Sequence, residues 1–75
     1  MNENDPTIVQ PIEFTERELQ VIPLLKEGKG TKQIAFQLGI VTRSVEVHLT
    51  HIYEKLDVCC RTEAVVKLIH LSDKQ

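Results

Sequence analysis

The side chains of this sequence that could carry out chemistry are three histidines and two adjacent cysteines. Neighbouring cysteines such as Cys59 and Cys60 very rarely form a disulfide with each other. His48, His51 and His70 do not have the spacing from a cysteine pair that a zinc site requires. The sequence also contains no glycine-rich phosphate loop and no nucleophile at a useful spacing from a base. We therefore expect no enzyme activity, no metal site, no cofactor and no small-molecule ligand.

Charge is distributed unevenly along the 75 residues, whose formal net charge is −2. Acidic side chains prevail before residue 19, whereas the segment 26–43 carries four basic side chains and one acidic one. A net negative charge argues weakly against nonspecific nucleic-acid binding, but a local basic region can still contact phosphates. No apolar run is long enough to span a bilayer, and the N-terminus has no signal-peptide pattern. We therefore expect a cytoplasmic location and no membrane contact.

The first of four predicted helices has recognisable signals at both ends. Thr15 is a typical N-cap residue, and Glu18 three residues later can complete a capping box with it. Gly28 is a typical residue for ending a helix. Pro23 lies inside this helix, where it removes a backbone hydrogen bond. We therefore expect a helix that begins after Thr15 and is kinked or shortened at Pro23.

Three further helices follow, with apolar residues at helical spacing, and no segment alternates with the period of a strand. These helices are expected at about 31–38, 42–56 and 61–71. Val41 cannot cap the helix that follows it, so we expect Thr42 to take over as its N-cap. Residues 1–13 are expected to form a flexible arm. The sequence thus predicts an all-α fold, a four-helix bundle over residues 14–75 that contains a helix-turn-helix.

The helix-turn-helix is indicated by the spacing of three residues in the middle of the chain. Ala35 is small enough for two helices to cross closely, and Gly39 tolerates the positive φ of a tight turn. Val45 is an apolar β-branched residue early in the next helix, where it can lock the crossing. An ordinary αα-hairpin in a small bundle would need the same three residues for packing alone. The spacing by itself therefore leaves DNA binding and a purely structural hairpin as alternatives.

The stretches FTERELQVIPLLKEGKGTKQIAFQLGI and SVEVHLTHIYEKLDVCCRTEAV resemble the LuxR/FixJ/GerE-type DNA-binding domain. The resemblance covers Phe14 to about Leu71. It implies a four-helix, helix-turn-helix domain of bacterial transcription regulators. It also implies that the third helix enters the major groove of double-stranded DNA and that the fourth helix forms a homodimer. RNA polymerase is a further partner that the resemblance suggests.

The resemblance and the helical phase together imply roles for individual side chains. The residues expected to read base edges are Glu46, Val47, Thr50 and His51. The residues expected to contact phosphates are Thr31, Lys32, Arg43, Ser44, Lys55 and Arg61. The residues expected at the dimer interface are Val66, Ile69 and His70. The plainer alternative for these positions is a solvated surface, or for the last group a cover on part of a larger body.

Glu46 departs from the family pattern, in which a lysine is frequent at this position. A glutamate near phosphates weakens binding by repulsion, yet it can accept a hydrogen bond from cytosine N4 in the major groove. We therefore expect weaker nonspecific affinity and retained sequence readout. The alternative is a protein-interaction module, in which the fold has lost its DNA affinity and binds another protein through its acidic face and fourth helix.

Glu18 lies in phase with the apolar stripe of the first helix, and a half-buried acid needs a partner. We expect a structural ion pair with Arg61, so that Arg61→Ala would lower the melting temperature markedly. His48 shares the apolar face of the third helix, and we expect it to be a core histidine with a satisfied ring nitrogen.

Overall fold

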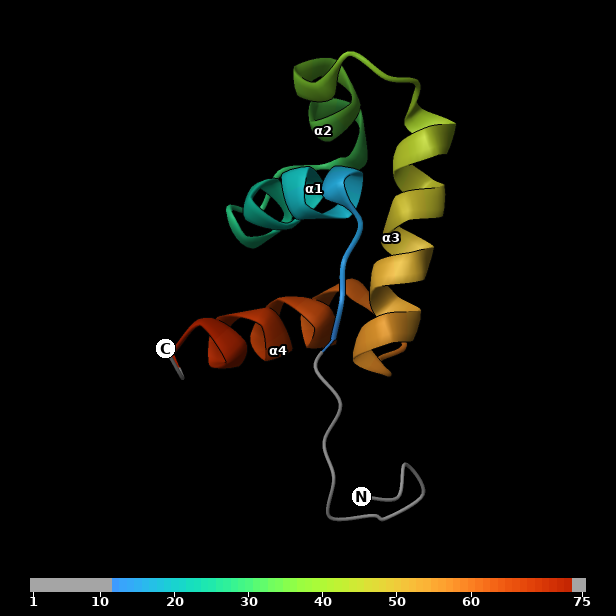
Figure 1. Cartoon of the computed structure of the whole chain (residues 1–75). Coiled ribbons are helices and arrows are strands. Elements are labelled where there is room, and N and C mark those ends of the chain that lie inside the picture. The colour runs from blue at the N-terminus through green and yellow to red at the C-terminus, as the bar shows by residue number, and fades with distance from the viewer. Residues whose placement is uncertain (1–11, 74–75) are drawn as a thin grey trace.

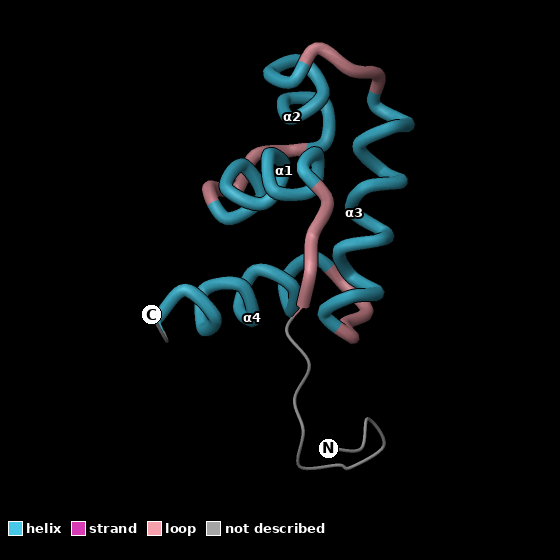
Figure 2. Tube along the Cα trace, in the orientation of Figure 1, coloured by secondary structure: helices cyan, strands magenta, loops and turns pink. Residues whose placement is uncertain are grey.

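The computed structural model describes residues 12–73, with side chains up to Leu71. Its helices are α1 (Glu16–Lys26), α2 (Thr31–Leu38), α3 (Thr42–Leu56) and α4 (Arg61–Asp73), as Figure 1 shows. The range 12–73 contains no strand (Figure 2), so the all-α prediction is confirmed. Of the flexible arm expected at 1–13, all but the last two residues lie outside the described part of the chain.

The longest helix, α3, contacts each of the other three. Figure 1 shows α2 beside the N-terminal half of α3, with α1 and α4 lying across α3 on the same side as α2. Along the opposite side of α3 no other helix of residues 12–73 is seen (Figures 1 and 2). The packing therefore uses one side of α3 and leaves the other side open.

The start of α1 forms as its sequence predicts. The Thr15 hydroxyl oxygen accepts a hydrogen bond from the Glu18 N–H at 3.2 Å, and the Thr15 N–H donates to Glu18 Oε1 at 3.0 Å. These two bonds make a capping box, which satisfies two backbone donors at the helix start. Pro23 does not end the helix, because α1 continues to Lys26. Gly28 follows with φ +87°, a conformation that favours glycine.

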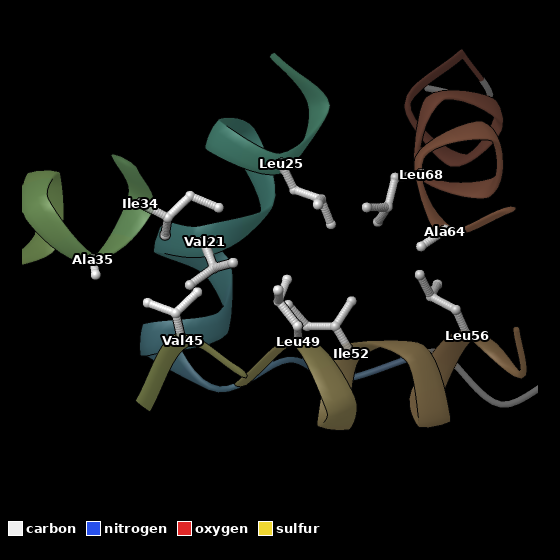
Figure 3. Packing of buried hydrophobic residues seen from close by; sticks show 10 residues of the cluster. All are labelled: Val21, Leu25, Ile34, Ala35, Val45, Leu49, Ile52, Leu56, Ala64 and Leu68. Carbon is white, nitrogen blue, oxygen red and sulfur yellow. The ribbon is translucent and has the colours of Figure 1, made fainter. Parts of the chain in front are cut away.

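The core is aliphatic and draws on all four helices (Figure 3). Its buried members are Val21, Leu25, Ile34, Ala35, Val45, Leu49, Ile52, Leu56, Ala64 and Leu68. The four that come from α3 recur every three or four residues, so they lie on one face of that helix. Burial of this single face fixes the rotation of α3 about its axis, and thereby decides which of its side chains point away from the bundle.

The turn between α2 and α3 has the geometry that the sequence spacing predicts. Gly39 adopts φ +68°, in the left-handed region, and the Ile40 N–H donates to the Ala35 carbonyl at 3.0 Å. Ala35 itself is buried. The expectation that Thr42 caps α3 is wrong, because Val41 occupies the N-cap position and Thr42 is the first helical residue. The side chain of Val41 makes no capping hydrogen bond, so α3 begins on backbone hydrogen bonds alone.

Candidate nucleic-acid interface

The residues predicted to read base edges lie together on α3 and are exposed. They are Glu46, Val47, Thr50 and His51. The buried face of α3 holds Val45 and Leu49, so the structure places the predicted readers on the other faces of the same helix. His48 lies between the two sets and is half-buried, at the margin of the core rather than inside it.

Thr50 uses its hydroxyl proton within its own helix. The Thr50 hydroxyl donates to the Glu46 carbonyl oxygen at 3.0 Å. The outward parts of Thr50 are therefore its methyl group and the free lone pairs of its oxygen. These groups suit contact with a base that donates a hydrogen bond or presents a methyl group better than contact with a phosphate.

The predicted phosphate contacts fall into two groups. Thr31 and Lys32 lie in the first turn of α2, and Arg43 and Ser44 lie in the first turn of α3. The first turn of a helix presents unpaired backbone N–H groups and the positive end of the helix dipole, both of which favour an anion. These four residues therefore combine side-chain donors with two helix N-termini.

Lys55 is already paired. Its Nζ donates to Glu18 Oε1 at 2.6 Å, and it lies 5.7 Å from the centre of the Phe14 ring. Glu18 is only 1% exposed, and its Oε2 lies 3.8 Å from Nδ1 of His51. The predicted ion pair of Glu18 with Arg61 is therefore wrong: the first turn of α1 faces the second half of α3, and the cation comes from there.

This pairing determines the charge state of the Glu18 carboxyl group. Burial by itself would raise the pKa of Glu18. The hydrogen bonds from Lys55 and from the Thr15 backbone outweigh burial, together with the positive charge of Lys55, and lower the pKa below its ordinary value of 4.5. Glu18 is therefore an ionised buried carboxylate that joins α1 to α3.

Arg61 stands at the start of α4, and its Nη2 is buried without a hydrogen-bond partner among the described residues. A shielded nitrogen of this kind cannot reach a phosphate without a change of rotamer. The exposed apolar side chains of α4 include Val66 and Ile69, which are 50% and 42% exposed, and His70 is exposed beside them. The structure therefore brings the predicted dimer residues together on one helix surface.

Phe36 is an exposed residue that was not among the predicted site residues. Its side chain on α2 is 88% exposed, and it lines a shallow surface hollow with Lys29 and Lys32. The helical phase contained the signal, because Ile34 and Ala35 point into the core and the next residue must then turn away from it. Phe36 extends the open surface of the helix-turn-helix with an aromatic ring.

Within the described range the structure shows no helix long and apolar enough to cross a membrane. Nor does this range contain a group of three or more histidine, cysteine, aspartate or glutamate side chains that could hold a metal ion.

Comparison with known proteins gives a family match over most of the chain. The model of the GerE family, described as "Bacterial regulatory proteins, luxR family", matches residues 13–68. The transcriptional regulatory protein LiaR of Bacillus subtilis is 46% identical over 53 residues, which are 71% of this chain and 25% of that protein. The oxygen regulatory protein NreC of Staphylococcus haemolyticus is 40% identical over 62 residues, 83% of this chain and 27% of that protein.

The HTH-type transcriptional regulator MalT of Vibrio cholerae is 36% identical over 62 residues, which are 83% of this chain and 7% of that protein. The chain thus spans about a quarter of LiaR and NreC, and far less of MalT. The matched residues include the whole helix-turn-helix with its open α3 surface. The chain therefore belongs to the luxR family of bacterial regulatory proteins.

Proposed function

We propose that this chain binds double-stranded DNA in a sequence-specific manner, as the DNA-binding domain of a transcription regulator, with α3 in the major groove. The observation that carries this proposal is the open side of α3. The helix packs on the core through one face, and its exposed side chains lie where no other helix of residues 12–73 covers them. The major groove, about 12 Å wide, admits a single helix in this way.

In this arrangement the exposed residues of α3 would each contact a different group on the DNA. Val47 is suited to the methyl group of thymine and Glu46 to the amino group of cytosine. Thr50 and His51 follow one turn later and would reach the next base pairs. Thr31, Lys32, Arg43 and Ser44 would hold the phosphates on either side of the groove.

Lys55 and Arg61 are expected to contribute less to phosphate binding than the other basic residues. Lys55 is neutralised by Glu18, and the Nη2 of Arg61 is shielded from solvent. A protein that neutralises few phosphates has a shallow dependence of affinity on salt. We therefore expect specific binding with only modest salt sensitivity.

The fourth helix is the proposed dimer interface. Val66, Ile69 and His70 form an exposed, partly apolar surface on α4, away from the core residues Ala64 and Leu68. Two copies joined there would present two α3 helices to a two-fold related site. Sedimentation at several protein concentrations tests this part of the proposal, and Ile69→Glu should keep the protein monomeric.

The test of DNA binding is fluorescence anisotropy of a labelled duplex pool at several salt concentrations. Affinity should fall log-linearly with salt, and Arg43→Ala should reduce the slope by about 0.9, the value for one phosphate contact. Arg17→Ala, which removes a charge from α1 outside the proposed interface, is the matched control and should leave the slope unchanged.

Absence of binding even at low salt would refute the proposal and favour the protein-interaction module. Glu46→Lys would then show whether the acid is what removed DNA affinity. If Glu46→Lys restored salt-dependent binding, the fold would be competent for DNA and the acid responsible for its loss.

A further inference from the structure

Val41 stands where folding alone would favour a different residue. It occupies the N-cap position of α3, makes no side-chain hydrogen bond there, and is 67% exposed. Serine, threonine, aspartate or asparagine at this position would satisfy a backbone donor, whereas valine is among the poorest N-cap residues. An apolar side chain that neither caps the helix nor enters the core contributes little to stability. We therefore look for a function of Val41 in a contact that its exposed side chain makes with another molecule.

Val41 and Val47 line the same surface hollow. The hollow has a volume of about 270 Å³, and Arg43, Ser44 and His48 complete its wall. Val47 is 46% exposed and belongs to the outward surface of α3 proposed to face the major groove. The hollow is therefore continuous with the proposed DNA interface, and two valines give it an apolar lining.

The charge around the hollow and its lining indicate what it can hold. Arg43, one turn before Val47, is suited to a phosphate at the edge of the groove. Inside the major groove the base edges offer hydrogen-bonding groups and a single kind of apolar group, the C5-methyl of thymine. We propose that Val41 and Val47 together form a receptor for this methyl group, and that Val41 is a specificity-determining residue. This inference rests on the proposed function.

The neighbouring flank of α3 carries the charged side chain of Glu46 in place of an apolar one. Successive residues of a helix are about 100° apart, so Glu46 and Val47 point to different flanks of α3. The flank of Val47 also carries the hollow, whereas Glu46 presents a carboxylate that suits a cytosine amino group. The two flanks of one turn thus select different bases, and Val41 extends the apolar flank beyond the helix itself.

Deoxyuridine provides a test of the receptor, because it differs from thymidine only by the missing C5-methyl group. A preferred site is first selected from a random duplex pool with the whole chain. Each thymine of that site is then replaced by deoxyuridine in turn, and the affinity is measured by anisotropy at constant salt. At one thymine the loss of the methyl group should weaken binding about two- to fivefold, the effect of one buried methyl-sized group.

Three variants locate the contact. Val41→Ser and Val47→Ala should both bring the ratio of the two affinities at that thymine close to one. Val41→Ser supplies a good N-cap, so its melting temperature should not fall and a loss of discrimination cannot come from unfolding. Leu19→Ser, at an exposed apolar site on α1 that lies outside both the proposed DNA interface and the proposed dimer interface, is the control and should keep the wild-type ratio.

Every other outcome overturns a stated part of the proposal. If the wild-type protein binds its site equally well with deoxyuridine at every thymine, or selects a site without thymine, the receptor does not exist although the proposed function stands. If the ratio is unchanged in Val41→Ser, Val41 is not part of the receptor. If no duplex is bound at low salt, the proposed function fails and this inference fails with it.

Discussion

Two helix junctions in this domain each contain a basic side chain. At the first junction this side chain is paired with a carboxylate, and at the second one of its nitrogens has no hydrogen-bond partner among the described residues. Where α1 meets α3, Lys55 donates to the buried carboxylate of Glu18 at 2.6 Å. Where α3 leads into α4, the Nη2 of Arg61 is buried without a hydrogen-bond partner in the described range. The positive end of the α4 dipole also lies at Arg61, which disfavours a cation there. The comparison indicates that the cation of the first junction is paired with a buried carboxylate, whereas the guanidinium of Arg61 at the second junction does not stabilise the fold by such a pairing.

The capping box explains why the acid lies at the first junction. Glu18 is held in place by two hydrogen bonds with Thr15, so its position at the start of α1 is supported by local contacts that do not depend on the other helices. Once buried against α3, the carboxylate needs a cation, since an unpaired buried charge is strongly unfavourable. Lys55 is within reach and remains partly exposed, so only one of the two charges is fully desolvated.

The largest expected difference is between Lys55→Met and Arg61→Met. Lys55→Met leaves Glu18 buried without its cation and should lower the free energy of unfolding by about 2–4 kcal/mol at neutral pH. Arg61→Met keeps the apolar stem and removes an unpaired buried donor, so its effect should stay below about 1 kcal/mol. Urea unfolding followed by circular dichroism measures both. Equal losses in the two variants would remove the distinction between the junctions.

A double-mutant cycle sharpens the comparison at the first junction. Glu18→Gln keeps an acceptor for the Thr15 N–H but removes the charge. If Lys55 acts mainly on that charge, Lys55→Met should cost less in the Glu18→Gln background, with a coupling of about 1–2 kcal/mol. The same cycle with Arg61→Met should give coupling near zero. A coupling of Glu18 to Arg61 as large as that to Lys55 would contradict the observed pairing.

Acid should weaken the first junction specifically. The pKa of Glu18 lies below its ordinary value of 4.5, so the folded protein favours the charged form more than the unfolded chain does. This contribution to stability is fully present above pH 4.5 and is lost as the pH falls through the lowered pKa of the folded state. The loss should be smaller than the effect of Lys55→Met, because neutral Glu18 still accepts a hydrogen bond.

Urea midpoints of the wild-type protein and of Glu18→Gln, measured from pH 7 downwards, check this dependence. Both proteins share the titration of all other acids, so only the difference between them reports on Glu18. That difference should shrink below pH 4.5. A difference that stayed constant would show that the carboxylate is not stabilised in the folded state.

Of the two paired lysines, Lys67 at the second junction should show the smaller effect. Lys67 of α4 donates from its Nζ to the carbonyl oxygen of Leu56, the last residue of α3, at 2.8 Å. Lys67→Met removes this bond and should cost about 1 kcal/mol, because the carbonyl can partly regain water. Lys32→Met on the surface of α2 is the control and should change the urea midpoint less. An unchanged midpoint in Lys67→Met would show that α4 joins α3 through apolar contacts alone.

Features that depend on neighbours along the chain could be predicted from the sequence. The capping box of α1, the left-handed Gly39 and the face of α3 that enters the core each follow from spacings of three or four residues. The mistake at the start of α3 was also local: Val41 was correctly excluded as a side-chain cap, but the backbone begins the helix there without one. The exposure of the proposed base readers follows from the helical phase, whereas their proposed role rests on the family resemblance.

Partners that meet across helices could not be predicted in this way. The pattern showed that Glu18 needs a cation, but Lys55 and Arg61 are both basic residues near the ends of helices. Which one reaches the carboxylate depends on the crossing of α1 with α3, and a helical period contains no information on crossing angles. The hollow between Val41 and Val47 likewise exists only because the turn brings a residue outside α3 beside its outward face. The sequence by itself thus determined which residues form each helix and each face, and the tertiary structure decided which of them meet.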